Sequence, residues 1–495
     1  MSGFRGVSRG LPWSLVAQII MSGGQLVYAA MTARLFTPGE YGGFAAAVSL
    51  MGILSLLTTT GLPSFVLREA ELGKRAVLKI RLCGLVGGIL SSIAFLLLVP
   101  FWLMVLRAPE GHLYVGLLAI GQAIAPAASI ESAILRRELH ARNDALALLV
   151  SFVLACGFAL SLALITRQSW TLAVLVVVQS VLLALLSRLF QSEKRAQGEP
   201  VVYKKIVEFT RNITAQNTGF FLLQRLPEWI MSASLGSSAL GQYARGASLA
   251  QMPATALNAA LNRAMQPYWR LVSKTDVADK AMNDAAILSA GVSFPAFGIV
   301  AVNAGALVDL WLGKGWEQAG ALATLLAIGA GLAVPFGGLA SSQEMRGNFK
   351  HVRRAQWSMA ISLVIPLLFL FLTHVVWWAA AAVTISSLVG LYVMAISSTS
   401  SGNGLRVRMR SQLAWRLGSL VLWSAGVSLI GWFAGLAAAK MVSSSGQLAV
   451  AATQVGVAGT VSLSAWLLTF RWHETNRVLR RRGVRLPNFI AGRSA

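Results

Sequence analysis

The sequence has few charged residues, and acidic residues are the scarcer kind. Of 495 residues, 12% are charged and 56% are hydrophobic, whereas a soluble domain carries about 25% charged residues. A globular protein of this length cannot cover its surface at that charge density, and a disordered chain would have far less apolar content. We therefore expect an all-α, polytopic membrane protein.

Cysteine and histidine are scarce as well. Cys83 and Cys156 both lie in apolar stretches, so the sequence contains neither a disulfide framework nor a metal-type cysteine spacing. The five histidines are scattered along the chain, which argues against a histidine metal cluster. We expect no cofactor and no metal, apart from a possible coupling ion, either a proton or sodium.

The apolar stretches are long and numerous enough for about 14 transmembrane helices, since a helix needs about 20 apolar residues to cross the hydrocarbon core. The predicted spans are 12–34, 42–64, 83–106, 113–135, 145–166, 170–190, 209–233, 241–264, 285–312, 318–341, 355–374, 377–398, 417–438 and 447–470. The first span lacks a small-residue cleavage site, so we expect it to be retained rather than removed as a signal peptide.

The basic residues indicate the orientation of these spans. The chain has 42 Lys and Arg against 18 Asp and Glu, a net charge of +24. With the N-terminus inside, 35 of the 42 fall in cytoplasmic segments and 5 in outside ends and loops. This bias follows the positive-inside rule, so both termini are expected in the cytoplasm and no nucleic-acid partner is needed to explain the charge. The basic tail 471–495 is expected to lie on anionic membrane lipids; a specific protein partner is the alternative.

Two short segments of the chain resemble each other. The first, "GGFAAAVSL", starts at Gly42, and the second, "GQYARGASL", starts at Gly241. They open the second and eighth predicted spans, which run in the same direction, so the pattern predicts parallel repeats with a substrate cavity between two bundles. The predicted domains are a six-helix bundle (1–190), a cytoplasmic linker (191–208), a second six-helix bundle (209–398), two additional C-terminal helices (399–470) and the basic tail (471–495).

Three motifs resemble one known family. They are "ARLFTPGEYGGFAAAVSL" (33–50), "LGQYARGASLAQMPATALNAALNRAMQPYWRL" (240–271) and "LVDLWLGKGWEQAG" (307–320). In this order and on these spans, they are similar to the polysaccharide transporter family, the Wzx-type flippases of the MATE-like superfamily. The resemblance implies a multi-pass protein of the bacterial inner membrane that is no enzyme. Its implied cargo is an undecaprenyl-diphosphate-linked oligosaccharide, the repeat unit of O-antigen, exopolysaccharide, capsule or a teichuronic-type polymer.

Other functions share parts of this pattern. A MATE-type cation-coupled multidrug antiporter has the same fold, although cationic drugs would favour an acidic cavity. A lipid II flippase differs only in cargo. A membrane polymerase or ligase would need a sizeable outside loop, and the sequence has none. We expect a monomer, since 14 spans enclose their own cavity, with a polysaccharide polymerase complex as a possible partner.

Charged residues within the predicted spans are the first candidates for the site, because each costs at least about 2.5 kcal/mol to insert. Arg225 lies in the seventh span with Glu228 three positions on, on the same helix face. The two form either a self-neutralising buried pair or a cavity cation with an ion-coupling carboxylate. Arg245 and Arg34 lie near the outer ends of their spans, where they either reach the interface or join Arg225 in a cluster. Arginine suits diphosphate, because its planar fork holds phosphate oxygens in pairs.

Polar residues on the first and eighth spans complete the candidate site. Gln25 belongs to a polar stripe along the first span, and Asn258 and Asn262 lie on the eighth. Such residues bond either to neighbouring helices or to substrate, since lipid offers them no partner. Glu131 and Asp309 are further candidates for carrying a coupling proton or sodium ion.

Overall fold

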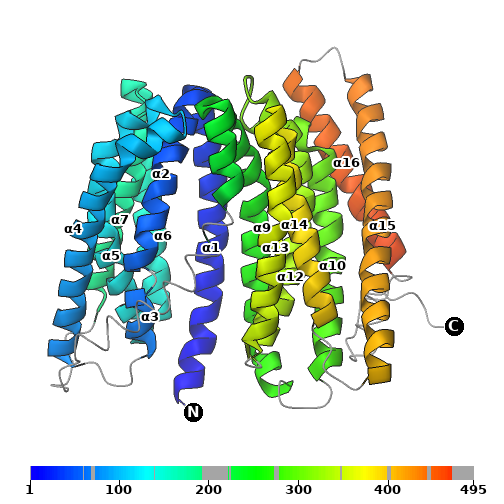
Figure 1. The fold of residues 1–495 in the computed structure, drawn as a ribbon, viewed down its shortest axis with the longest axis horizontal. Coiled ribbons are helices and arrows are strands. Elements are labelled where there is room, and N and C mark those ends of the chain that lie inside the picture. The colour runs from blue at the N-terminus through cyan, green and yellow to red at the C-terminus, as the bar shows by residue number, and fades with distance from the viewer. Residues whose placement is uncertain are drawn as a thin grey trace. The chain divides into compact units, whose positions relative to one another are not determined.

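A computed structural model gives the fold. It describes residues 2–59, 61–68, 73–138, 140–191, 221, 225–272, 278–345, 348–397, 403–442 and 447–470, and every regular element within these ranges is a helix (Figure 1). The chain divides into two compact units, Met1–Gly241 and Gln242–Ala495. The predicted all-α fold is therefore confirmed. The predicted linker 191–208 and tail 471–495 lie outside the described residues, apart from Gln191.

The first unit contains eight elements before residue 191. They are α1 (Ser2–Leu35), α2 (Pro38–Thr59), α3 (Gly61–Arg68), α4 (Lys74–Val105), the short 3-10 helix η1 (Pro109–Tyr114), α5 (Val115–Arg137), α6 (Ala141–Thr166) and α7 (Thr171–Leu189). Residues 225–235 are also helical, and α9 (Ser237–Val272) begins in this unit.

The described residues of the second unit form the rest of α9 and seven further helices. They are α10 (Ala278–Val302), α11 (Ala304–Trp311), α12 (Glu317–Met345), α13 (Phe349–Thr373), α14 (Trp377–Ser397), α15 (Asn403–Met441) and α16 (Gln447–Phe470).

Within the described residues, 12 helices are long and apolar enough to cross a membrane. They match the predicted spans one to six and nine to fourteen, so the chain is a multi-pass membrane protein. The predicted seventh span lies largely outside the described residues. The predicted eighth span is α9, which has 36 residues but is not among the 12, because polar residues such as Arg245 and Asn258 lower its hydropathy.

Two predicted spans are each divided into two helices. The second span separates into α2 and α3, and the ninth separates into α10 and α11 at Asn303. The side-chain Nδ2 of Asn303 donates to the carbonyl oxygen of Ile299 at 2.9 Å. A short amide side chain competes in this way with the helical backbone bonds and favours a helix end, which hydropathy alone does not reveal.

The same pairs of helices pack against each other within each unit. In the first unit α4 packs on α5, α5 on α7, and α6 on α7; in the second, α10 packs on α12, α12 on α14, and α13 on α14. These are the same pairs of spans, displaced by six. The helices α15 and α16 pack on each other and on α10 and α11 of the second unit (Figure 1). The packing therefore supports the repeat that the short sequence match indicated.

A helix-capping motif recurs at the same place in both units. The helices α6 and α13 end at Thr166 and Thr373. The residues that follow them, Arg167 and His374, have left-handed φ values of 51° and 54°. Their backbone N–H groups donate to the carbonyl oxygens of Ala163 and Leu370. Each is followed three residues later by a tryptophan, so the sequences read Thr-Arg-x-x-Trp and Thr-His-x-x-Trp. A left-handed residue after the last helical turn commonly satisfies a terminal carbonyl.

The repeated glycines mark a close approach between α2 and the first turn of α9. A Cβ atom at Gly42 would overlap the carbonyl oxygen of Ser237 and lie 3.0 Å from the nitrogen of Gly241. A Cβ atom at Gly241 would overlap the carbonyl oxygen of Pro38. Small residues let helix backbones approach this closely in membranes. The two glycines are thus needed for packing, and this explains why they recur.

We expect Gly42→Ala and Gly241→Ala to destabilise the protein, because overpacking of this kind costs about 1–3 kcal/mol. The measurement is the thermal unfolding midpoint of the full chain in detergent. Gly157→Ala is the matched control, since no atom lies within 4 Å of a Cβ at that helical position. An equal midpoint for Gly42→Ala and Gly157→Ala would contradict the close approach.

Candidate functional site

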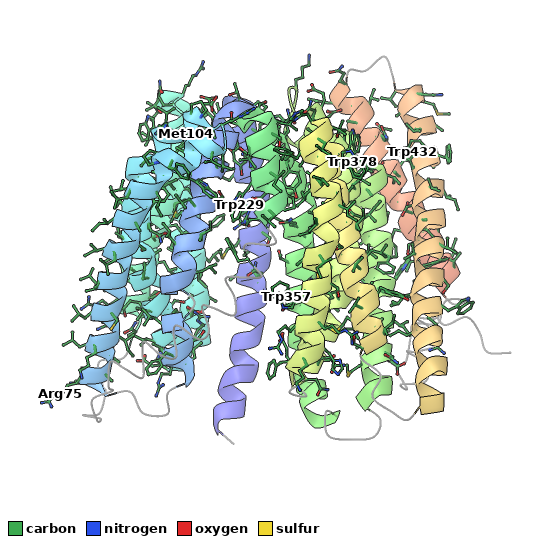
Figure 2. The ribbon with its side chains drawn as sticks, in the orientation of Figure 1. Arg75, Met104, Trp229, Trp357, Trp378 and Trp432 are labelled. Atoms are coloured by element: carbon green, nitrogen blue, oxygen red, sulfur yellow. The ribbon has the colours of Figure 1, made fainter. Side chains whose placement is uncertain are left out.

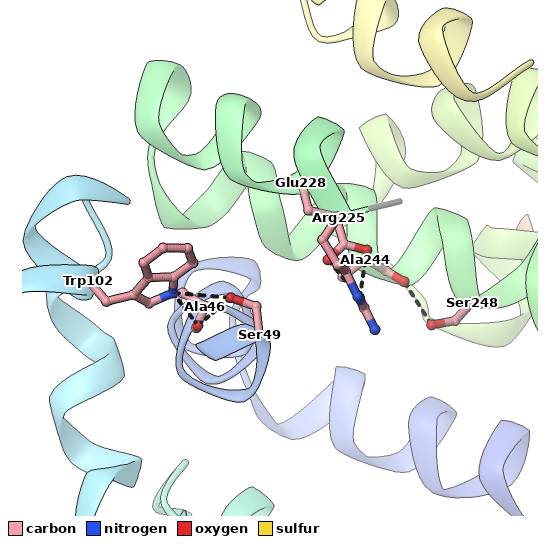
Figure 3. Close-up of polar contacts among 7 residues, drawn as sticks. All are labelled: Ala46, Ser49, Trp102, Arg225, Glu228, Ala244 and Ser248. Atoms are coloured by element: carbon pink, nitrogen blue, oxygen red, sulfur yellow. Dashed lines mark hydrogen bonds and ion pairs between the residues drawn. The ribbon is translucent and has the colours of Figure 1, made fainter. Parts of the chain in front are cut away.

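The predicted pair of Arg225 and Glu228 forms in the structure. Nη1 of Arg225 donates to both carboxylate oxygens of Glu228, at 2.8 and 2.7 Å (Figure 3). The Glu228 side chain is 14% exposed and the Arg225 side chain 41%. The guanidinium also lies 5.4 Å from the centre of the Phe221 ring. One nitrogen of the arginine therefore makes both hydrogen bonds to the carboxylate, and the Arg225 side chain as a whole stays partly exposed.

The second edge of the Arg225 guanidinium determines what else this ion pair can bind. Nη1 donates both of these hydrogen bonds, and no described residue accepts a hydrogen bond from Nη2. A guanidinium has five N–H donors in a fixed fork, so the second edge can donate to an external anion. The pair is thus self-neutralising and still has donors for a phosphate.

A polar and aromatic contact network fixes the helix that carries Arg225. The rings of Trp229 and Trp102 meet edge to face at 5.1 Å. Nε1 of Trp102 donates to the carbonyl oxygen of Ala46 and to Oγ of Ser49, each at 3.2 Å (Figure 3). Oγ of Ser232 donates to the carbonyl oxygen of Leu106 at 2.6 Å. Residues 225–235 are therefore anchored on α2 and α4, which limits where Arg225 can reach.

Arg245 lies in a different environment from the one expected near a membrane interface. It is 4% exposed, and its guanidinium carbon lies 5.9 Å from the centre of the Trp316 ring. Next to it, Gln242 donates to the carbonyl oxygen of Gly315 at 2.7 Å and accepts from the N–H of Ala319 at 2.9 Å. Gln242 and Arg245 together hold the loop before α12 against α9.

The other predicted substrate-binding residues are dispersed. Arg34 is exposed in the last turn of α1, and Gln25 is half-buried on the same helix. Asn258 packs against α12, where its Oδ1 lies 2.8 Å from a Cβ built at Gly337. Asn262 is on α9, but its side chain lies outside the described residues. Since Arg245 belongs to the second unit, the predicted cluster of Arg34, Arg225 and Arg245 stays a prediction.

Glu131 is embedded in a network at the end of the first unit predicted to be cytoplasmic. Its Oε2 accepts from Nη2 of Arg81 and from Nε2 of Gln191, both at 2.7 Å, and its side chain is 7% exposed. Gln191 also accepts from Arg81 at 3.1 Å. The network joins α4 and α5 to the residues that follow α7, so Glu131 has a structural role whether or not it binds an ion.

Asp309 lies on α11, outside the helices long enough to span, and is exposed. Partial burial, and to a lesser degree the charge of Glu317, raise the pKa of the Asp309 carboxyl. The described residues contain no group of three or more His, Cys, Asp or Glu side chains that could hold a metal ion.

Several supporting residues carry no signal that hydropathy analysis detects. Their partners are distant in the sequence and come close only in the folded chain. These residues are Gln242, Trp316, Arg81 and Gln191. One feature does have a local signature: Thr37 and Glu40 bond each other's backbone N–H at the start of α2. This capping box appears in the sequence as Thr-Pro-Gly-Glu, and it sets where the closely packed turn of α2 begins.

Comparisons with known proteins agree with this fold. A family model described as "Polysaccharide biosynthesis protein" matches residues 31–321. The succinoglycan biosynthesis transport protein ExoT of Rhizobium meliloti is 21% identical over 334 residues, which cover 66% of this chain and 67% of that protein.

Two solved structures show a similar fold at low identity. The lipid II flippase MurJ, in an inward closed conformation, has a TM-score of 0.70 at 11% identity. The match covers 93% of this chain and 99% of the MurJ chain. The eukaryotic MATE transporter AtDTX14 has a TM-score of 0.53 at 15% identity and covers 84% of this chain and 100% of its own.

We expect Gln242→Ala to destabilise the protein by about 1–3 kcal/mol, because it leaves the backbone groups of Gly315 and Ala319 without their partner. The thermal unfolding midpoint in detergent measures this loss. Gln251→Ala is the matched control, because Gln251 is exposed on the same helix. If both substitutions lower the midpoint equally, the loop is not held by Gln242.

Proposed function

Because the chain belongs to the polysaccharide biosynthesis protein family, and because its fold resembles that of MurJ and MATE transporters, we propose that it is a flippase. Its cargo is an undecaprenyl-diphosphate-linked oligosaccharide, which it moves from the inner to the outer leaflet of the bacterial inner membrane. The oligosaccharide is the repeat unit of O-antigen, exopolysaccharide, capsule or a teichuronic-type polymer. The protein acts as a transporter and makes or breaks no bond.

The observation that carries this proposal is the partly exposed side chain of Arg225, which binds Glu228 through Nη1 alone. A lipid-linked diphosphate needs cationic donors at membrane depth while its lipid tail stays in the bilayer. Arg225 lies within the predicted seventh span, and its second edge is open to a bidentate phosphate contact. Charged residues inside a membrane are costly and are retained mainly for function, so this arginine is the best-supported cargo contact. Arg34, Arg245, Gln25, Asn258 and Asn262 remain further candidates.

Transport proceeds by alternating access, the mode of transporters that are built from two repeats. A diphosphate on the second edge of Arg225 would be repelled by the nearby carboxylate of Glu228. A proton or sodium ion on Glu228 would relieve that repulsion, so we place ion coupling at this pair before Glu131, which is bound by Arg81 and Gln191, or Asp309, which lies outside the spanning helices.

The lipid-linked glycan pool of a strain lacking the gene tests the cargo. We expect the lipid-linked oligosaccharide to accumulate on the cytoplasmic leaflet and the surface polymer to disappear, because translocation is blocked. Mass spectrometry of the pool, after separation by membrane side, identifies the glycan. Accumulation of lipid II would indicate the cargo named for MurJ. An unchanged pool with increased drug sensitivity would favour a MATE-type antiporter and contradict the proposal.

Charge substitutions separate a cargo contact from a structural ion pair. We expect Arg225→Gln to abolish surface polysaccharide, and the double variant Arg225→Gln/Glu228→Gln to abolish it too, because both lack the phosphate donor. Glu228→Gln alone should retain cargo binding. Surface polymer is measured in strains with matched membrane levels of each variant. Recovery of polymer in the double variant would show that only neutralisation of Glu228 matters, which contradicts cargo binding by Arg225.

A further inference from the structure

The helix α13 has an unusual charge distribution at its first two turns. Lys350, Arg353 and Arg354 are all exposed there, and the first turn contains no acidic residue. Cations near a helix N-terminus are unfavourable, because the helix dipole places partial positive charge at that end. These residues therefore do not stabilise α13 itself.

The corresponding helix of the first repeat shows the opposite arrangement. The first turn of α6 contains Asp144, which accepts a hydrogen bond from Ser132 at 2.6 Å and lies 3.7 Å from Arg136. For α13, the described part of the chain records no ion pair to Lys350, Arg353 or Arg354. Three cations and a helix N-terminus thus form a concentrated positive region with no acidic counterpart among the residues that the structure describes.

The exposed face of α13 continues from these cations into apolar side chains. Trp357 (Figure 2) is 61% exposed and Ile361 is 68% exposed. Together with Lys350 and Arg354, they recur at helical spacing on one face. Beyond them, Val364 and Leu368 extend the same exposed face. The opposite face, with Val352 and Ala355, packs into the core of the second unit.

This order of side chains, with cations first and then aromatic and apolar groups, matches the layout of an anionic phospholipid. We propose that the start of α13 binds an anionic phospholipid, with its phosphate at Lys350, Arg353 and Arg354. The interfacial region of the lipid lies against Trp357, and an acyl chain follows Ile361 and Leu368. Tryptophan favours the interface because its ring is amphipathic, and basic residues near the membrane surface attract anionic lipid. The site lies at the end of α13 predicted to be cytoplasmic, and it is independent of the proposed cargo contact at Arg225.

Native mass spectrometry of the full chain in detergent tests this site, with phosphatidylglycerol as the probe and phosphatidylcholine as the neutral lipid. We expect Lys350→Gln/Arg353→Gln/Arg354→Gln to weaken binding of the first phosphatidylglycerol on the order of 100-fold, because the attractions of the three cations for the anionic headgroup add up. Binding of phosphatidylcholine should not change. The charge-conserving variant Lys350→Arg/Arg353→Lys/Arg354→Lys should retain binding within a few-fold.

A second triple variant controls for net charge. Arg167→Gln/Lys314→Gln/Lys440→Gln removes three cations from the end predicted to be outside, and it should leave the first phosphatidylglycerol bound as in the wild type. Equal loss in both triple variants, or no loss in the α13 variant, would overturn the proposal. Displacement of the lipid by millimolar inorganic phosphate would do so too, because it would indicate a simple anion site. Unchanged thermal unfolding midpoints in neutral detergent verify that each variant is folded.

Discussion

The structure depends on one constraint: polar groups away from water must find their partners within the protein. Hydrocarbon offers neither donors nor acceptors, so an unsatisfied group there costs several kcal/mol. Serine and threonine hydroxyls throughout the helices donate to carbonyl oxygens one turn back, as Thr384 does to Ala380. Charged groups follow the same rule in pairs, as with Arg225 and Glu228 or Arg81 and Glu131. Arg225 is informative because it binds its carboxylate through one nitrogen and keeps further donors for the cargo contact proposed above.

The two repeats keep the same helix pairs but differ in the residues that fix them. In the first, Gly43 brings α2 close to η1, and its Cβ would lie 2.7 Å from the nitrogen of Gly111. The matching position in the second repeat is Gln242, which reaches Gly315 and Ala319 through its amide. Three positions on, Ala46 is replaced by Arg245, which lies over Trp316. The connection between the third and fourth spans is thus held by close backbone packing in the first repeat. In the second repeat it is held by the side-chain hydrogen bonds of Gln242.

Charge is arranged for two different purposes along the chain. At the end of α5 predicted to be cytoplasmic, Glu131 and Ser132 link to Arg81 of α4, Gln191 after α7 and Asp144 of α6, which ties this part of the first unit together. At the start of α13, the cations have no such partners among the described residues and face outward. Paired charge of the first kind stabilises a bundle, whereas unpaired charge of the second kind attracts anionic lipid.

The sequence alone determined the membrane class, the spans matched by 12 helices and the repeat, because hydropathy, charge bias and short matches are properties of neighbouring residues. It also indicated the pair of Arg225 and Glu228, which are three positions apart on one helix. Only the tertiary structure decided the surroundings of Glu131 and Gln242, because their partners are far away in the chain: Arg81 and Glu131 are 50 residues apart, and Gln242 and Gly315 are 73 apart. Contacts of that kind depend on how helices pack, which local patterns of hydropathy do not encode.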